Sequence, residues 1–335
     1  MMKLSTMVDI GLVWGSEKET PLPDSLVDLW FRDYDSVEFI RISANCVLRF
    51  KAEDRAFVLR VNSERERSVE QWAAEIGFVN YLAESGLRVA KPVLSRNGSC
   101  VGSVETAMGL LHASVFEAMP GRICYELSDL TPGMLTAWGH ALGALHQQSQ
   151  GYVNGAGRPS WRDHLRLIET YLPTTEQGAW KQLEQVRAKL DKLPVNDGSF
   201  GLIHFDFELD NIVWDGDSAG IIDFDDCAYY WYAADIAFAL RDLFEDRADR
   251  VDLNSEPYGL FIQGYRAARD IGEDDLHLIP LFLRMHNLMV FAKLVRTLED
   301  GRQPIEPEWM DGLRTKLLNA LQRYRDAFAE YPDLE

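Results

Sequence analysis

The sequence is poor in the residues that build disulfide frameworks and zinc sites. Its 335 residues include four scattered cysteines and seven histidines, with no CxxC, HxH or HxxxH pair. Pairs at such spacings are typical of structural zinc sites and of small secreted domains. The sequence therefore predicts neither a structural metal nor a disulfide-stapled fold, and it disfavours a metal-dependent hydrolase with histidine ligands.

Long apolar runs and an excess of positive charge are also missing. No apolar run approaches the roughly 18 residues that cross a bilayer, and the first residues lack the apolar core of a signal peptide. The formal net charge is −19, which argues against nucleic acid or an anionic membrane as a partner. We expect a cytoplasmic protein. The charge is compatible both with solubility alone and with an acidic cleft for a cationic substrate.

The first third of the chain reads as β structure after an ambiguous start. Residues 1–36 are compatible with one or two short helices. Short apolar or alternating runs over Val37–Ile42, Cys46–Lys51 and Ala56–Val61 predict a three-stranded antiparallel meander. These patterns separate an N-terminal helical extension, 1–36, from the β-rich part that follows it.

A helix and further strands complete the β-rich part. Ser68–Ser85 carries apolar residues at helical spacing. Asn97–Gly98 predicts a hairpin turn between Val93–Leu94 and Cys100–Val104, and Leu110–Met119 reads as another strand. We expect residues 37–120 to form a small antiparallel sheet with one helix inserted after its third strand.

The rest of the chain, residues 121–335, reads as mainly helical. A helix is expected over Thr131–Gln148, and two short strands, Gly201–His204 and Gly220–Phe224, flank a loop. Four later helices are expected over about Ala233–Phe244, Tyr258–Asp270, Leu276–Leu298 and Glu308–Phe328. The predicted fold class is α+β, with a small β-rich lobe followed by a larger helical one.

The strongest chemical signal is an HxDxxxxN pattern formed by His204, Asp206 and Asn211. An apolar strand then delivers Asp223 twelve residues after the asparagine. Oxygen-bearing side chains on loops at the ends of apolar segments suit phosphoryl transfer. One carboxylate can accept the proton of an attacking hydroxyl, while an amide and a second carboxylate hold Mg²⁺ through hard oxygen ligands.

These residues resemble the aminoglycoside phosphotransferase and choline kinase group, which shares its catalytic core with protein kinases. The resemblance implies a kinase-like two-lobed fold, with a nucleotide-binding lobe over 37–120 and a catalytic and substrate-binding lobe over 121–335. It implies that Asp206 is the catalytic base and that Asn211 and Asp223 are the metal ligands. In such proteins His204 would support the loop, and Asp235 would hydrogen-bond the backbone of the catalytic loop.

The resemblance also implies a nucleotide site in the β-rich part. Arg60 takes the position where the family usually has a phosphate-binding lysine, and Glu75 is its expected partner, with Glu70 as the competitor. Arginine is always charged and binds phosphate well, although its fork has a different reach. A strand-end cation facing solvent is the alternative for Arg60. Because no GxGxxG occurs, Ser43 and the turn around it either cover the phosphates or form a simple hairpin turn.

Glu117 and Met119 resemble the hinge that joins the two lobes. There, backbone groups would hydrogen-bond the adenine edge while apolar side chains enclose the ring. A chain leaving the edge of a sheet has the same sequence pattern.

The substrate side departs from the family. Phe205 replaces the usual glycine, and Glu208 stands where protein kinases carry a phosphate-contacting lysine. Glu208 is expected either to bind an amine of the substrate or to pair with an arginine or face solvent. Asp225, next to Asp226, and Arg284 on a late helix are further candidate substrate contacts. Tyr229–Tyr232 fits packing better than an aromatic cage for a cation.

The sequence thus predicts a phosphotransferase that moves the γ-phosphate of ATP (or GTP), with Mg²⁺, to a hydroxyl of a small molecule. An amine-bearing alcohol and an aminoglycoside-like compound are both compatible acceptors. The competing hypothesis is a kinase-like module that binds ligand without catalysis.

Overall fold

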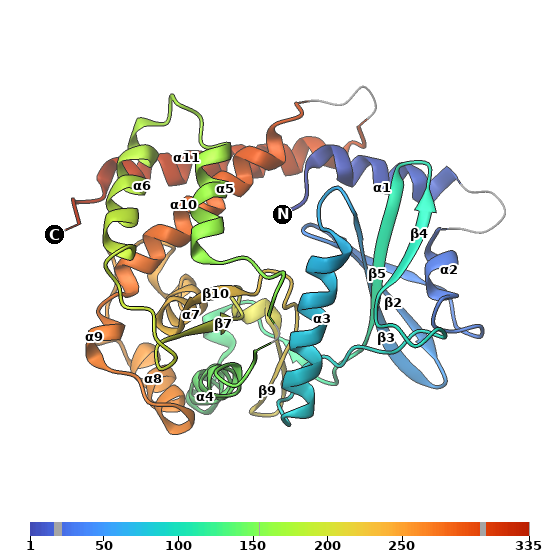
Figure 1. Ribbon diagram of the computed structural model, residues 1–335, viewed down its shortest axis with the longest axis horizontal. Coiled ribbons are helices and arrows are strands. Elements are labelled where there is room, and N and C mark those ends of the chain that lie inside the picture. Colours follow the sequence, from blue (N-terminus) through green and yellow to red (C-terminus); the bar gives the residue numbers. More distant parts are fainter. Residues whose placement is uncertain (17–21, 154, 302–305, 335) are drawn as a thin grey trace. The chain divides into compact units, whose positions relative to one another are not determined.

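The computed structural model describes residues 1–16, 22–153, 155–301 and 306–334. The chain forms two compact units, coloured along the sequence in Figure 1. The first, here called the sheet unit, comprises residues 1–80, 90–118 and 294–317. The second, here called the helical unit, comprises residues 81–89, 119–293 and 318–335.

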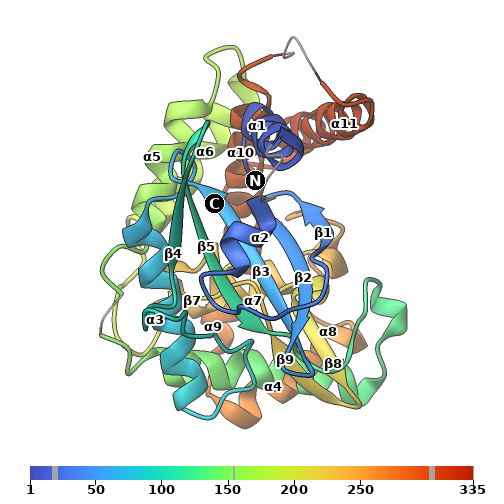
Figure 2. The same cartoon turned by 90° about the vertical axis from the view of Figure 1, so that its right-hand side faces the viewer.

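The sheet unit is built on a five-stranded antiparallel sheet in the order β1-β2-β3-β5-β4, whose strands Figure 2 shows running side by side. The elements of this part of the chain are α1 (Leu4–Ser16), α2 (Leu22–Val27), β1 (Glu38–Ile42), β2 (Cys46–Ala52), β3 (Arg55–Ser63), α3 (Val69–Glu84), β4 (Gly102–Thr106) and β5 (Gly109–Glu117). The predicted meander, the helix after its third strand and the short N-terminal helices are confirmed.

Helix α3 packs on the sheet through its apolar face. Trp72 and Ile76 are buried against Phe116 of β5, and the Trp72 indole donates to the hydroxyl of Ser114 at 2.6 Å. A buried indole N–H needs such a partner. The contact therefore fixes which face of α3 meets the sheet, and with it the direction of Glu75 on the same helix.

The predicted hairpin around Asn97–Gly98 is wrong in its pairing. The turn exists, because Ser95 N–H donates to the Ser99 carbonyl at 2.8 Å and Gly98 has a φ of 82°. However, β4 begins only at Gly102 and pairs with β5. The hydroxyl of Ser95 also binds the turn, donating to the Ser99 carbonyl at 2.5 Å. The turn is thus closed locally, and the long apolar strand β5 is the partner that buries β4.

The helical unit carries two small sheets among its helices: β10 pairs with β7, and β8 lies between β6 and β9. The elements from residue 122 onward are β6 (Arg122–Ile123), α4 (Pro132–Ser149), α5 (Trp161–Tyr171), α6 (Gln177–Leu190), β7 (Phe200–Ile203), β8 (Ile212–Asp215), β9 (Ser218–Ile221), β10 (Ala228–Trp231), α7 (Tyr232–Ala239), α8 (Glu256–Ala268), α9 (Glu273–Leu276), α10 (Ile279–Leu298) and α11 (Trp309–Glu330), with 3₁₀ turns η1 (Leu127–Asp129), η2 (Leu209–Asn211) and η3 (Asp242–Phe244).

Helices α4 and α8 lie side by side in the helical unit, as Figure 1 shows. Their backbones approach closely at two glycines. A Cβ at Gly139 would lie 1.8 Å from the Phe261 carbonyl oxygen, and one at Gly264 would lie 1.8 Å from that of Thr136. Only glycine leaves room for this contact, which holds α4 against α8. Helix α4 also contacts strands β7 and β9.

One helical stretch is more apolar than the sequence led us to expect. Glu273–Leu298 is long and apolar enough to cross a membrane, but 72% of its most apolar window is buried within the protein. A core helix that is apolar on all sides has this property, so the stretch is the interior helix of a globular fold.

Candidate active site

The predicted base and metal ligands lie on two loops of the helical unit that a hairpin brings together. The catalytic loop, residues 204–211, follows β7 and leads into β8. Strand β8 pairs with β9 in a register that sets Ile212 opposite Ile221, and Ile222 N–H donates to the Asn211 carbonyl at 3.0 Å. Asp223 follows at once. The spacing between Asn211 and Asp223 is therefore the length of one tight hairpin.

Asp206 is held from two sides. Its Oδ2 accepts a hydrogen bond from the Asn211 amide at 3.1 Å, and its Oδ1 accepts one from the Arg241 guanidinium at 3.1 Å. The Asn211 amide also donates to the Asp206 carbonyl at 2.8 Å. The side chain stays 29% exposed. A fixed carboxylate that ligands can still reach is suited to accept a proton from a bound hydroxyl.

His204 joins the catalytic loop to the hairpin. Its Nε2 donates to the Ile222 carbonyl at 3.0 Å, while its Nδ1 accepts from the Asp206 N–H at 3.3 Å. The ring is completely buried. Both ring nitrogens are thus used in supporting the loops, as expected from the sequence.

Asp235 anchors the start of the catalytic loop, which confirms its expected role. It lies at the beginning of α7 and accepts the backbone N–H groups of His204 and Phe205, each at 2.8 Å. His146 adds a third hydrogen bond at 2.9 Å and itself accepts from the Tyr265 hydroxyl at 2.8 Å. Burial lowers the pKa of His146. The network therefore joins a neutral His146 imidazole to the buried Asp235 carboxylate, which accepts its hydrogen bond.

Replacing Asp235 with alanine is expected to destabilise the fold by about 3–5 kcal/mol, because two backbone N–H groups and an imidazole would lose their buried acceptor. Chemical denaturation measures the free energy of unfolding. Asp242→Ala is the matched control, since Asp242 is an exposed acid a few residues further along. Equal losses in the two variants would contradict the anchoring role.

Phe205 shows why glycine is usual at its position. Its φ is 74°, in the left-handed region that costs a residue with a side chain about 1–2 kcal/mol. The ring is buried and contacts His164 and Phe238, with centroids 5.0 and 4.9 Å away. Burial of a phenyl ring contributes more than the strain costs. This protein thus tolerates the substitution by packing the ring into its aromatic core.

Glu208 does not face open solvent. Its carboxylate pairs with Arg241, the same arginine that contacts Asp206. The structure therefore shows the arginine-paired alternative, and a contact with a substrate amine stays a prediction. Sequence reasoning missed Arg241. Its only signal was a cation two residues after the mainly apolar α7.

The acidic loop, residues 223–226, is held by two cations that sequence reasoning also missed. Arg158 donates to the backbone carbonyls of Asp225 and Cys227, at 2.5 and 2.9 Å. Lys293 pairs with the carboxylate of Asp226 at 2.7 Å. Asp225 is buried, and its predicted substrate contact stays a prediction. Arg158 thus holds the backbone of this loop, and Lys293 holds one of its carboxylates.

Arg284 is built into the core of the helical unit. It is buried and donates to Gln182 at 2.9 Å and to the Pro332 carbonyl at 2.7 Å. Its guanidinium also lies over the Tyr331 ring. These contacts favour a structural role, and its contact with substrate stays a prediction.

The segment Tyr229–Tyr232 is part of the protein interior. Tyr229, Tyr230 and Trp231 belong to β10, which pairs with β7, and Tyr230 is completely buried with its hydroxyl 2.9 Å from His164 Nδ1. The expectation of packing is confirmed.

The sheet unit confirms the predicted pairing of Arg60 with Glu75. The two side chains meet at 2.5 Å, and Arg67 approaches the other oxygen of Glu75 at 3.0 Å. The Arg60 guanidinium lies over the rings of Trp72 and Phe116, 5.0 and 5.1 Å from their centroids. A planar guanidinium can stack in this way, whereas an ammonium is a point charge. This gives arginine a physical reason to replace the usual lysine.

Replacing Arg60 with alanine is expected to raise the KM for ATP by about 10–100-fold, because one charge-assisted phosphate contact contributes about 1.5–3 kcal/mol. Initial rates over a range of ATP concentrations measure this. Arg49→Ala is the control, since Arg49 is an exposed cation on the neighbouring strand β2. An unchanged KM in Arg60→Ala would remove Arg60 from the nucleotide site.

The remaining nucleotide-site predictions lie on turns and strand ends. Ser43 lies in the β1–β2 turn, which Asn62 supports by donating to the Ala44 carbonyl at 2.9 Å. Glu117 ends β5, and its N–H already donates to the Lys91 carbonyl at 2.9 Å. Met119 packs in the helical unit over Gly220, where a Cβ would meet its Cε at 2.3 Å. The roles of Ser43, Glu117 and Met119 stay predictions.

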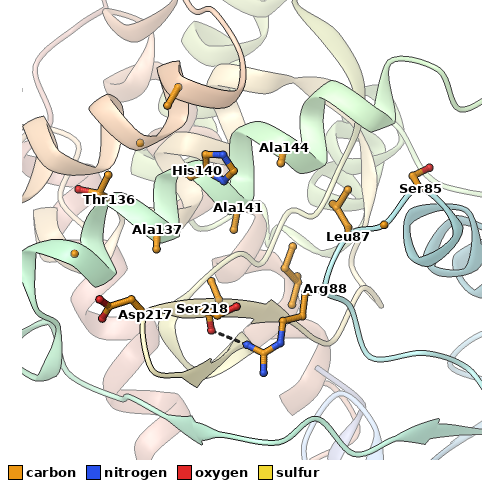
Figure 3. A pocket seen from close by; sticks show the side chains of 16 residues that line it. Ser85, Leu87, Arg88, Thr136, Ala137, His140, Ala141, Ala144, Asp217 and Ser218 are labelled. Atoms are coloured by element: carbon orange, nitrogen blue, oxygen red, sulfur yellow. Dashed lines mark hydrogen bonds between the residues drawn. The ribbon is translucent and has the colours of Figure 1, made fainter.

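A cavity of about 510 Å³ in the helical unit lies away from these residues. It is bounded by α4 and by the β8–β9 turn, where Arg88 donates to the Ser218 carbonyl at 2.6 Å, and by Gly264 of α8 (Figure 3). Alanines of α4 form much of its floor. None of the predicted site residues lines this cavity.

The buried polar atoms of the two loops indicate whether these loops suit a metal ion. Asn211 is buried, and within the described residues its Oδ1 accepts no hydrogen bond. Such an oxygen is costly unless a ligand completes it. No group of three His, Cys, Asp or Glu side chains in the described chain could hold a metal. A site completed by phosphate oxygens needs only one or two protein ligands, so Asn211 and Asp223 fit Mg²⁺.

Comparison with known proteins identifies the class. Residues 38–271 match the family described as "Phosphotransferase enzyme family". Because this match spans most of the chain, the protein belongs to that family. It is a phosphotransferase of the kinase type that acts on an alcohol group, as the sequence predicts.

Individual relatives agree with this assignment. The chain is 27% identical over 271 residues to the amicoumacin kinase of Bacillus subtilis (strain 168), covering 78% of this chain and 80% of the relative. It is 24% identical to a homoserine kinase of Agrobacterium fabrum, covering 64% and 66%. A solved amicoumacin kinase in complex with AMP-PNP, Ca²⁺ and Ami has a TM-score of 0.79 at 23% identity and covers 97% and 96%. The kinase-like α+β fold is thereby confirmed.

Proposed function

We propose that this protein transfers the γ-phosphate of ATP (or GTP), with Mg²⁺, to a hydroxyl of a small amine-bearing molecule. The observation that carries the proposal is the geometry of the two loops. Asp206 is oriented by Asn211, and the β8–β9 hairpin sets Asn211 beside the residue that precedes Asp223. These contacts support the proposal that a base and two hard oxygen ligands act at one site.

In the proposed reaction the carboxylate of Asp206 accepts the proton of the acceptor hydroxyl. The hydroxyl oxygen forms a bond to the γ-phosphorus, and the bond to the bridging oxygen of ADP breaks. Asn211 and Asp223 would hold Mg²⁺, which neutralises charge on the β- and γ-phosphates when bound. Asp206 therefore orients the hydroxyl as well as accepting its proton, since positioning accounts for much of the catalysis in this reaction class.

The nucleotide side of the proposal rests on the sheet unit. Arg60, braced by Glu75 at 2.5 Å, would bind the phosphates that are not transferred. The adenine edge would meet backbone groups near Glu117 and Met119. The Glu117 N–H already donates to the Lys91 carbonyl. The Glu117 carbonyl is therefore the group that would accept a hydrogen bond from the adenine amine. Ser43 would lie over the phosphates.

The acceptor proposal rests on charge and on relatives. The net charge of −19 favours the approach of a cation. The acidic loop that contains Asp223 adds further negative charge, part of which Lys293 offsets by pairing with Asp226. The relatives include proteins named amicoumacin kinase and homoserine kinase, and homoserine carries an amine as well as a hydroxyl. An amine-bearing alcohol is accordingly the first class to test.

The test is a screen of Mg²⁺-ATP consumption over a panel containing amicoumacin, homoserine, choline, simple sugars and an aminoglycoside, repeated with GTP. We expect one amine-bearing class to be turned over well above the rate without acceptor. Turnover should disappear when Mg²⁺ is chelated. Uniform rates across the panel, equal to that without acceptor, would overturn the proposal.

A further inference from the structure

Arg241, just after the end of α7, contacts two carboxylates of the catalytic loop, those of Asp206 and Glu208. Its Nη2 contacts Asp206 Oδ1 at 3.1 Å and also the carboxylate of Glu208. Its Nη1 donates to the Phe238 carbonyl at 3.1 Å, and its side chain is only 11% exposed. An arginine that is buried, tethered to backbone and shared by two acids has little freedom to move.

Helix α7 and the residues just after it thus contact the catalytic loop at two points. Near its beginning, Asp235 accepts the N–H groups of His204 and Phe205. Just after its end, Arg241 donates to Asp206. Because a helix is a rigid spacer, these two contacts fix both the backbone of the loop and the direction of its carboxylate.

We propose that Arg241 is a positioning residue for Asp206 and that Glu208 is the anchor that holds the guanidinium in place. This inference rests on the proposed function, in which Asp206 is the base. It gives Glu208 a role other than substrate binding. An acid two residues after the base would repel the incoming phosphoryl group, but paired with Arg241 it instead brings a cation to that position.

The charges explain why both members of the pair are needed. Asp206, Glu208 and Arg241 together carry one net negative charge. Without Arg241 the same space holds two unpaired carboxylates, which repel each other and an anionic phosphate. Without Glu208 the guanidinium binds Asp206 alone and competes with the acceptor hydroxyl for its oxygen. The orientation of Asp206 therefore depends on both the positive charge of Arg241 and the negative charge of Glu208.

The test compares Arg241→Gln, Arg241→Lys, Glu208→Gln and the double variant, using Mg²⁺-ATP and the best acceptor of the panel. Arg241→Gln is expected to lower kcat by about 100-fold, the usual cost of a misplaced catalytic group. The KM for ATP should stay within about twofold, because a contact that acts through the base is not a ground-state contact to nucleotide. Arg241→Lys should recover part of kcat by restoring the charge.

The double variant distinguishes a role of Arg241 in orienting Asp206 from a role only in the stability of the fold. Glu208→Gln alone should lower kcat, yet Glu208→Gln in the Arg241→Gln background should raise it, because an unpaired carboxylate is removed. Arg247→Gln is the matched control, since Arg247 follows α7 closely and also bridges two acids, Asp249 and Glu330. It should leave kcat unchanged. Thermal unfolding of each variant reports whether it is folded.

Three outcomes overturn the proposal. Arg241→Gln could keep the wild-type kcat, or it could raise the KM for ATP as much as it lowers kcat, or the double variant could be slower than Arg241→Gln. If Arg241→Gln does not fold, Arg241→Lys and Glu208→Gln give the same test through their kcat and KM. A wild-type protein that turns over no acceptor overturns the proposed function itself, and this inference with it.

Discussion

Asp206→Asn is expected to lower kcat by about 10²–10⁴-fold, the usual contribution of a general base, while leaving the binding of Mg²⁺-ATP largely intact. Asparagine keeps the shape of the side chain but cannot accept the proton. It also presents a less favourable partner to Arg241, which donates to Asp206 Oδ1 at 3.1 Å. The measurement is steady-state turnover with saturating acceptor, together with the KM for ATP.

Asp215→Asn is the matched control for Asp206→Asn. Asp215 ends β8, just beyond the catalytic loop, and its side chain is 65% exposed. Its replacement should leave kcat unchanged, because exposed charges contribute little. If Asp206→Asn kept more than about a tenth of the wild-type kcat, the loss would lie below the range of a general base and Asp206 would lose that role.

Asp223→Ala is expected to abolish metal-dependent nucleotide binding as well as turnover. A ligand at a hundred times its Kd stabilises a folded protein by about 2.7 kcal/mol. Wild-type protein should therefore unfold several degrees higher in Mg²⁺-ATP, and EDTA should remove the shift. The variant should lose most of the shift, since Asp223 is the proposed principal metal ligand. Differential scanning fluorimetry measures both proteins.

Asp217→Ala is the control for this experiment, because Asp217 is an exposed acid in the β8–β9 turn. It should keep the full shift. A variant Asp223→Ala that is stabilised by Mg²⁺-ATP as strongly as wild type would remove Asp223 from the metal site. A wild-type protein that is not stabilised at all would favour a module without nucleotide binding.

The sequence was sufficient where contacts are local. The link between the segments that carry Asn211 and Asp223 could be predicted because one hairpin sets their spacing, as the pairing of Ile212 with Ile221 shows. Asp235 could be predicted because its backbone contacts are a family feature. The pairing of Arg60 with Glu75 followed from a strand and a helix that are close in the chain.

The sequence was insufficient where contacts join distant segments. Arg241 lies 35 positions from Asp206, and Lys293 lies 67 positions from Asp226. No periodicity reports such pairs. The positive φ of Phe205 was also hidden, because a buried ring outweighs a backbone preference that points to glycine. Helices α5 and α6 were not predicted, and no element was expected between Gln148 and Gly201.

The departures from the family now have physical explanations. Arg60 stacks on Trp72, Phe205 fills an aromatic core and Glu208 holds Arg241. In each case contacts with neighbouring residues accommodate the unusual side chain. The chemistry assigned to Asp206, Asn211 and Asp223 is therefore compatible with unusual residues around it.

Phosphorus NMR of the complete reaction tests the central claim most directly. Wild-type protein is incubated with Mg²⁺-ATP and the best acceptor of the panel, in parallel with Asp206→Asn. The account predicts a new phosphate monoester resonance from the acceptor, in an amount equal to the ADP formed, and none from the variant. ADP with inorganic phosphate alone, or equal monoester from both proteins, would contradict phosphoryl transfer to a hydroxyl oriented by Asp206.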